Sequence, residues 1–186
     1  MPSHINYAPD SSMVFISLQG SDSLLAIEVK TGKVVWKAKV GSTPAGVLWH
    51  NDKLLVGIMG DDYVAVVDPV DGHVERKVRT GRGAHVMFVP HDGRVIYVSN
   101  RVDGSITTLD AESLMPIRTF TIPGGPDDMD FAPDGTAWIS MRFAHEIAIA
   151  DPSTGRFRIV RVGRSPHGIW LNTHDALPAP RTASWS

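Results

Sequence analysis

The sequence has no cysteine among its 186 residues. This absence excludes disulfides, thiolate zinc sites, iron–sulfur clusters, haem attached through paired cysteines, and cysteine nucleophiles. The sequence also has no apolar run of about 18 residues, the length that a membrane-spanning helix requires. The first ten residues, MPSHINYAPD, do not combine a charged start with an apolar stretch, so the chain as given shows no signal peptide.

The chain also lacks a bias toward one sign of charge. It has 18 Lys and Arg against 20 Asp and Glu, a net charge of −2, with both signs spread along its length. A protein that binds the phosphates of nucleic acid needs a concentrated basic face, so we predict no nucleic-acid partner. The motifs GxSxG, HExxH, GxxxxGK[ST] and GxGxxG are absent, so no catalytic or nucleotide-binding class is indicated by motif.

What the sequence does contain is a repeat of about 40 residues. Its first anchor is an acidic residue between two β-rich runs, at Glu28, Asp68, Asp110 and Asp151, with spacings of 40, 42 and 41 residues. Its second anchor is a segment led by Pro or Gly, such as PDDMDFAPD at 126–134. This segment starts near residues 2, 44, 83, 126 and 166. Two anchors with one period indicate a repeat architecture.

Each repeat contains four short β-rich runs separated by turn residues. In the third repeat the runs cover 84–89, 94–99, 105–109 and 117–122. They are rich in Val, Ile, Phe, Tyr and Thr, and the turns carry Gly, Pro, Asp and Asn. Four strands per repeat predict an all-β fold, a β-propeller whose four-stranded antiparallel blades stack around an axis. The first strand of each blade should line that axis.

The chain resembles the YVTN-type β-propeller repeat family, which is related to the cytochrome-d1-like propellers. The resemblance lies in RVIYVSN (94–100), VGRSPHG (162–168), APDGTAWIS (132–140) and the turns DPVDG (68–72) and DPSTG (151–155), and it spans residues 2 to about 172. It implies a ring that closes with about seven blades and a periplasmic or extracytoplasmic location. Some members of the family serve respiratory or quinone-cofactor pathways.

The length departs from that family pattern. Residues 1–172 predict a partial propeller of four complete blades plus one inner strand at 167–172, followed by a polar, Pro-containing tail at 173–186. We therefore expect an incomplete ring, the C-terminal part of a longer propeller. A closed four-bladed ring, or a dimer that completes a larger ring, are the alternatives. The apolar faces of the two end blades predict self-association.

Polar residues recur at the turn that leads into each inner strand. The first position after the anchor Pro or Gly is predicted to align Ala84 with Asp127, and the second to align His85 with Asp128. These side chains could bind an anion, a metal or a cofactor at the channel mouth, or they could simply cap strand ends. The sequence leaves the metal and the cofactor open. The candidate ligand-binding residues of this rim are His4, His85, Asp127, Asp128, His167, Arg82 and Arg164.

A secondary polar set lies in the turn between the second and third strands. Arg101 and Arg142 occupy equivalent positions there, and His145 is nearby. Two arginines could bind a carboxylate or a phosphate. They could equally pair with acids of neighbouring blades.

The sequence leaves three functions open. The first is a non-catalytic binding or scaffold module for a protein partner or a small ligand at the channel mouth. The second, which the family resemblance suggests, is a protein that binds a metal or haem-type cofactor, or a lactonase-like enzyme, through the rim His and Asp residues. The third is a fragment without independent function.

Overall fold

The computed structural model describes residues 1–90 and 92–172, and they form four four-stranded antiparallel sheets. Blade I contains β1 (Pro2–Tyr7), β2 (Met13–Leu18), β3 (Ser23–Glu28) and β4 (Val34–Lys39). Blade II contains β5 (Pro44–His50), β6 (Lys53–Ile58), β7 (Tyr63–Val67) and β8 (Val74–Arg79). Blade III contains β9 (Ala84–Phe88), β10 (Val95–Asn100), β11 (Ser105–Asp110) and β12 (Pro116–Thr121). Blade IV contains β13 (Pro126–Phe131), β14 (Ala137–Met141), β15 (Glu146–Ala150) and β16 (Phe157–Arg161).

The strands of every blade pair in chain order, so each sheet is a simple meander. The only helical turn in the described part of the chain is η1 (Gln19–Ser21). The prediction of an all-β propeller with four-stranded antiparallel blades is therefore confirmed. No helix among the described residues is long and apolar enough to cross a membrane.

Three hydrophobic cores lie between neighbouring blades rather than inside a single sheet. Phe15 and Leu24 of blade I pack with Leu54 of blade II in the first core. The second core joins blades II and III, and the third joins blades III and IV. A lone sheet has a free face on each side, and stacking buries one face of each blade against the next. This packing explains why side chains of the central strands β6, β7, β10 and β11 are almost all buried.

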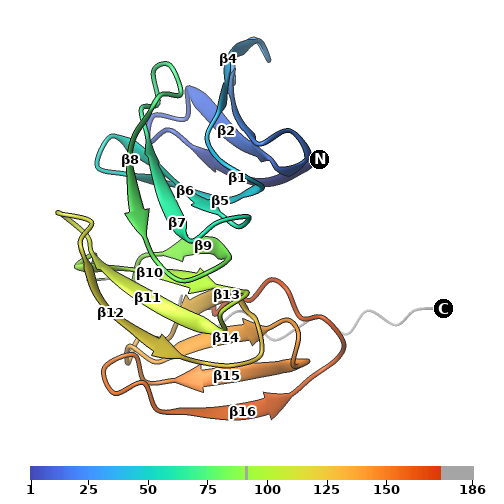
Figure 1. Cartoon of the computed structure of the whole chain (residues 1–186), viewed down its shortest axis with the longest axis vertical. Coiled ribbons are helices and arrows are strands. Elements are labelled where there is room, and N and C mark those ends of the chain that lie inside the picture. Colours follow the sequence, from blue (N-terminus) through green and yellow to red (C-terminus); the bar gives the residue numbers. More distant parts are fainter. Residues whose placement is uncertain (91, 173–186) are drawn as a thin grey trace.

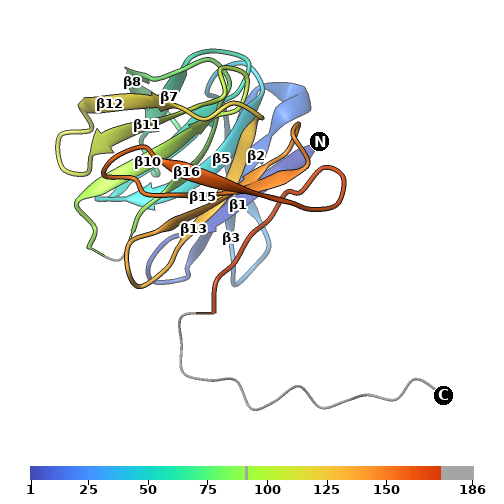
Figure 2. The ribbon, with the colours of Figure 1, turned by 90° about the horizontal axis from the view of Figure 1, so that it is seen from below.

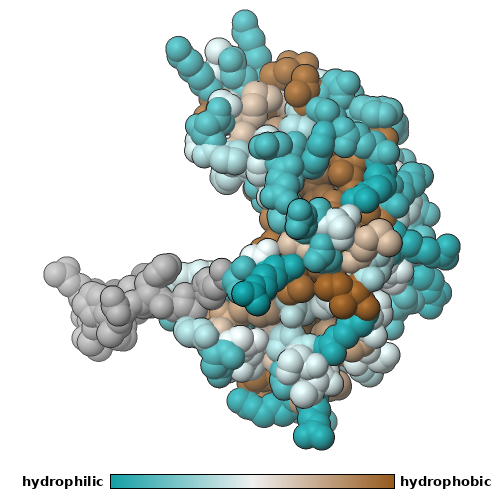
Figure 3. All heavy atoms as spheres, turned by 90° about the vertical axis from the view of Figure 1, so that its left-hand side faces the viewer, coloured by the Kyte–Doolittle hydropathy of each residue, from teal (hydrophilic) through white to brown (hydrophobic). Residues whose placement is uncertain are grey.

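The four blades form an open arc with the inner strands β1, β5, β9 and β13 side by side along it (Figures 1 and 2). The space-filling view shows the molecule hollowed on one side, between its upper and lower halves (Figure 3). No sheet formed by residues 1–90 and 92–172 closes the ring, as expected for an incomplete propeller. Among the described residues, one face of blade I has no neighbouring blade, and Ile5 and Tyr7 are more than half exposed there.

The inner strand predicted at 167–172 is not formed as a strand. The segment instead lies against blade IV through two side-chain bonds: the Ser140 hydroxyl donates to the His167 carbonyl at 2.5 Å, and the Leu171 N–H donates to Asp130 at 2.7 Å. An inner strand takes its ladder bonds from the second strand of its own blade. No second strand follows this segment among the described residues, so it has no ladder partner. The tail predicted at 173–186 lies outside the described residues.

Candidate polar site on the propeller axis

A β-bulge at the start of each inner strand positions the candidate residues. In every blade two residues of the inner strand stand opposite one residue of the second strand, and the register shifts there. Such bulges re-aim side chains at the end of a ladder. The paired bulge residues are Ser3 and His4 in blade I, Ala45 and Gly46 in blade II, His85 and Val86 in blade III, and Asp127 and Asp128 in blade IV.

The predicted alignment of blade III is wrong by one residue. Ala84, rather than Gly83, takes the place of the anchor proline, because Ala84 pairs with Asn100 as Pro126 pairs with Met141. His85 is therefore the structural equivalent of Asp127 and not of Asp128. The error arose because the predicted anchor was Gly83, which gives gaps of 39 and 43 residues to the neighbouring anchors Pro44 and Pro126, whereas Ala84 gives 40 and 42.

A serine on the second strand stabilises the bulge in three of the four blades. Ser17, Ser99 and Ser140 accept the N–H of the second bulge residue at 3.0, 3.2 and 3.0 Å. Ser99 also donates to the carbonyl of Asp127, in the next blade, at 2.9 Å. Each serine hydroxyl thereby fixes one bulge, and Ser99 also ties it to the following blade. These serines were not predicted, although their equivalent places in FISL, YVSN and WISM could have revealed them.

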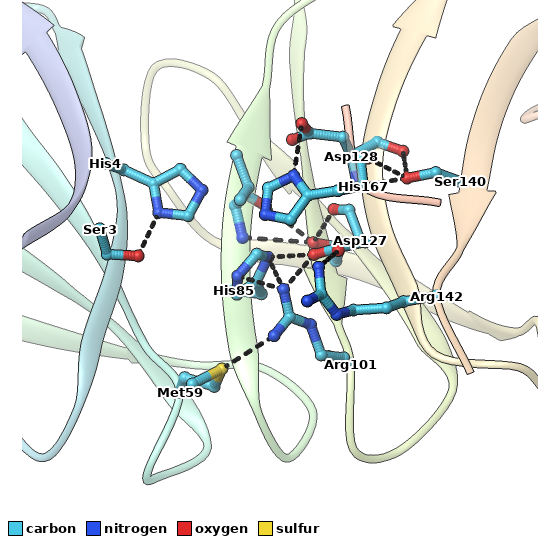
Figure 4. Close-up of polar contacts among 12 residues, drawn as sticks. Ser3, His4, Met59, His85, Arg101, Asp127, Asp128, Ser140, Arg142 and His167 are labelled. Carbon is cyan, nitrogen blue, oxygen red and sulfur yellow. Dashed lines mark hydrogen bonds and ion pairs between the residues drawn. The ribbon is translucent and has the colours of Figure 1, made fainter. Parts of the chain in front are cut away.

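Asp127 is the centre of the site, and it is fully buried. Its carboxylate contacts Arg101 Nη2, Arg142 Nη1 at 3.2 Å and His85 Nδ1 at 3.0 Å (Figure 4). Burial alone would raise the pKa of Asp127, but the hydrogen bonds from His85 and Arg101, together with the positive charge of Arg101, outweigh it. They hold the pKa far below its usual value. Asp127 is therefore a carboxylate throughout the physiological range.

His85 is buried beside Asp127, with a side chain only 1% exposed. Arg101 Nη2 lies 2.5 Å from its Nε2 and can only donate, so Nε2 accepts and Nδ1 carries the proton shared with Asp127. Burial lowers the pKa of His85, more than its bond to Asp127 raises it. The ring is thus neutral, with both of its nitrogens engaged.

Two more histidines approach the same place from opposite ends of the arc. The His4 ring lies 5.1 Å from the His85 ring and 6.2 Å from the His167 ring, measured between centroids. Burial, followed by the neighbouring imidazoles of His85 and His167, lowers the pKa of His4 to about 4. His167 Nδ1 lies 3.7 Å from Asp128 Oδ2. Burial, together with the charge of Asp127, raises the pKa of Asp128.

The two predicted polar sets therefore meet in part. Arg101 and Arg142, assigned to the secondary set, contact Asp127 directly, while His145 instead accepts the N–H of Ser165 at 3.1 Å. Arg82 lies outside the cluster on the surface and pairs with Asp103 at 2.8 Å. Arg164 is exposed, and no hydrogen bond or ion pair among the described residues joins it to the cluster.

One further contact of the site was not predicted. Arg101 Nη1 lies 3.5 Å from the sulfur of Met59 in blade II, and Arg101 Nε is buried without a hydrogen-bond partner among the described residues. Met59 follows Ile58 as Arg101 follows Asn100 and Arg142 follows Met141, so the repeat places Met59 at the equivalent position of blade II.

Comparison with known proteins places the chain in a family. The chain resembles hydrazine synthase from Kuenenia stuttgartiensis, with a TM-score of 0.73 and 24% identity over 86% of this chain and 49% of that one. This likeness shows the fold, and the chain spans about half the length of that relative. No curated protein matches the sequence. The model of the YNCE-like β-propeller family matches residues 1–180, so the chain belongs to this family, a propeller of the YVTN and cytochrome-d1-like type.

Proposed function

We propose that this protein is a non-catalytic binding module whose axial cluster holds a small ligand carrying a carboxylate or phosphate group. The proposal rests chiefly on the buried Nε of Arg101, which lacks an acceptor among the described residues. A buried guanidinium N–H without a partner is costly, and an acid group supplies the acceptor that it needs. The cluster is defined here as His4, His85, Arg101, Asp127, Asp128, Arg142 and His167.

The charges of the axial cluster favour an anion. Arg101 and Arg142 both contact Asp127, so two positive charges share one buried carboxylate. The opposing carboxylate of Asp128 has a pKa that burial raises, so it is less readily ionised than Asp127. The side chain of Arg142 is partly exposed and that of His167 is half exposed, so both can meet a ligand that enters from solvent. Guanidinium groups bind carboxylates and phosphates with paired, charge-assisted hydrogen bonds.

The same contacts argue against a metal in this cluster. Both nitrogens of His85 are engaged by Arg101 and Asp127, and Asp127 itself faces two guanidinium groups. Among the described residues, no three His, Asp or Glu side chains are arranged to hold an ion. His85 Nε2, the nitrogen that does not face Asp127, contacts Arg101 rather than a nucleophile. The contacts therefore support ligand binding over a lactonase-like reaction.

Titration with succinate and inorganic phosphate, followed by NMR of the histidine C–H signals, tests the proposal. We expect Arg142→Gln to weaken binding at least tenfold, equivalent to about 1.4 kcal/mol. Arg82→Gln is the matched control, because Arg82 is also paired with an aspartate but lies outside the cluster. Equal affinity in the wild type and Arg142→Gln would refute the proposal, as would no binding of either acid at millimolar concentration.

Proton uptake gives a second readout of the same site. The pKa of His4 is about 4 because the ring is buried near other imidazoles and Arg101. A bound anion would add negative charge beside that ring and raise the pKa, so binding should take up protons near pH 5. Calorimetry in buffers of different ionisation enthalpy measures this uptake. Binding without proton exchange would place the anion elsewhere.

The end face of blade I supports a further part of the proposal, self-association. Ile5 and Tyr7 expose apolar surface on a sheet face that no blade of the described residues covers, and a second copy of the arc offers the free face of its blade IV. A partner protein could use the same surface. By resemblance to its family, we infer that the protein acts outside the cytoplasm.

A further inference from the structure

A second cleft, lined by none of the residues of the axial cluster, opens between blades I and II. Its volume is about 480 Å³. Three aromatic rings form its inner wall: Phe15 of β2, Trp36 of β4 and Trp49 of β5. The exposed side chains of Val35 and Val70 extend the apolar lining outward. Concave, mostly apolar clefts of this size are the usual form of small-molecule sites.

The aromatic wall is held in place by its surroundings. The Phe15 ring centroid lies 5.9 Å from that of Trp36 and 5.8 Å from that of Trp49. The Trp36 indole N–H donates to the Pro69 carbonyl at 3.0 Å. Gly72 has φ +80 and approaches so closely that a Cβ there would lie 2.8 Å from the Trp36 ring. The rings are therefore preorganised, and ligand binding does not lose free energy to ordering them.

The charge of the cleft has one sign. Asp10 and Asp52 line its rim, and no lining residue is Lys, Arg or His. The Asp10 carboxylate accepts bonds from the N–H and hydroxyl of Ser12, which lower the pKa of Asp10 and keep it ionised. An apolar cation therefore matches both the wall and the rim of this cleft.

We propose that the cleft between blades I and II binds a quaternary or N-methylated ammonium group, with the cation against the faces of Trp36 and Trp49 and beside Asp10 and Asp52. Aromatic rings attract such cations through the negative face of the ring, and the bulky methyl groups favour an apolar wall. The methyl groups replace N–H donors, so water hydrates these cations only weakly. The aromatic cleft can therefore compete with water for them. The proposal is independent of the axial cluster.

The other inter-blade clefts have different chemistry. The cleft between blades III and IV, of about 660 Å³, has two aromatic rings, Tyr97 and Phe131, among proline, aspartate and serine residues. The cleft between blades II and III contains both acidic and basic groups, including Lys53 and Arg76. Among the clefts lined by described residues of neighbouring blades, only the one between blades I and II combines three aromatic rings with a purely acidic rim.

The test compares choline with 3,3-dimethylbutan-1-ol, which has the same shape but no charge. Saturation-transfer NMR and ring-current shifts of the N-methyl protons report binding against aromatic faces. We expect choline to bind at least fivefold more tightly than the alcohol, which corresponds to a cation–π contribution of about 1 kcal/mol. Equal binding of the two compounds overturns the proposal, as does failure of choline to bind.

Variants locate the site. The double variant Asp10→Asn and Asp52→Asn should weaken choline binding at least threefold and leave the alcohol unchanged. The matched control is Asp92→Asn with Asp134→Asn, which changes two acids of the cleft between blades III and IV. If the control variant weakens choline binding and the first does not, the assignment to blades I and II is wrong. Arg142→Gln should leave choline binding intact, which separates this result from that for the axial cluster.

Discussion

Two adjacent aspartates with opposite pKa shifts provide a direct test of the axial cluster. Asp127 is fully buried against Arg101 and Arg142, and its pKa is far below the usual value. Asp128 is the next residue of the same bulge, and burial raises its pKa. The same substitution, Asp to Asn, should therefore have different effects at the two positions.

The expected magnitude follows from the contacts that each change removes. Asp127→Asn leaves the largely buried Arg101 and the partly exposed Arg142 without their counter-charge. Removing one partner of a buried ion pair costs about 3–5 kcal/mol. For a domain of this length, each kcal/mol lowers Tm by about 2–4 °C, so we expect a loss of about 6–20 °C. Asp128→Asn removes a carboxylate whose ionisation is already disfavoured. Its stability should stay within about 1 kcal/mol of the wild type.

The pH dependence follows from the sign of each pKa shift. The pKa of Asp127 is lower in the folded protein than in the unfolded chain, so its contribution is fully present above the unfolded value of 3.8 and is lost as pH falls below it. The difference in stability between the wild type and Asp127→Asn should be constant from pH 7 to about 5. Each pH unit below about 3.8 should then reduce it by up to about 1.4 kcal/mol.

Thermal and urea denaturation, followed by tryptophan fluorescence at several pH values, measures these differences. The reasoning would be refuted if Asp127→Asn and Asp128→Asn lost equal stability at pH 7. It would also be refuted if the cost of Asp127→Asn did not shrink at acid pH. Circular dichroism of each variant at 20 °C, roughly the temperature of maximum stability, checks that both still form the β-sheet blades before they are heated.

The remaining predictions concern packing and association. Gly57→Ala would place a Cβ 2.9 Å from the His85 carbonyl carbon and close to its oxygen, which is backbone that cannot move freely. We expect a loss of about 1–3 kcal/mol in thermal denaturation, while Gly163→Ala, at a position with open space, should change little. The exposed face of blade I predicts concentration-dependent self-association in size exclusion with light scattering, reduced by Tyr7→Lys; a 20.2 kDa monomer at all concentrations would contradict this.

The strands were predictable because their signals are local. The runs expected at 94–99 and 105–109 became Val95–Asn100 and Ser105–Asp110, one residue from the prediction. Alternation of side chains across a pleated strand and turn residues at its ends are written in adjacent positions. The segment at 167–172 has the same local signals, but a strand also needs a ladder partner, and that partner is not a local property.

The repeat symmetry predicted only the part of the site that lies at equivalent positions of the inner strands. Equivalent positions in the repeats correctly brought His4, His85, Asp127, Asp128 and His167 to one end of the inner strands. Arg101 and Arg142 were predicted as a separate set. Since the second strand runs antiparallel to the first, the turn that follows it returns to the end where the first begins, and this places both arginines beside Asp127.

Blade II departs from the symmetry of the repeat at two glycines, and these glycines allow blade III to pack closely on it. Where blades I, III and IV carry a serine opposite the bulge, blade II carries Gly57, and its bulge contains Gly46. A Cβ at Gly46 would lie 2.7 Å from the His85 carbonyl oxygen. A Cβ at Gly57 would lie 3.0 Å from the Ala84 carbonyl oxygen. The two glycines thus allow the inner strand of blade III to press against blade II. This close approach sets the His85 backbone against blade II, while the ring is enclosed by Asp127, Arg101 and His4, and burial is the main cause of its lowered pKa. The repeat therefore positions the polar residues, and the two glycines of blade II set how closely the strand that carries His85 packs on its neighbour.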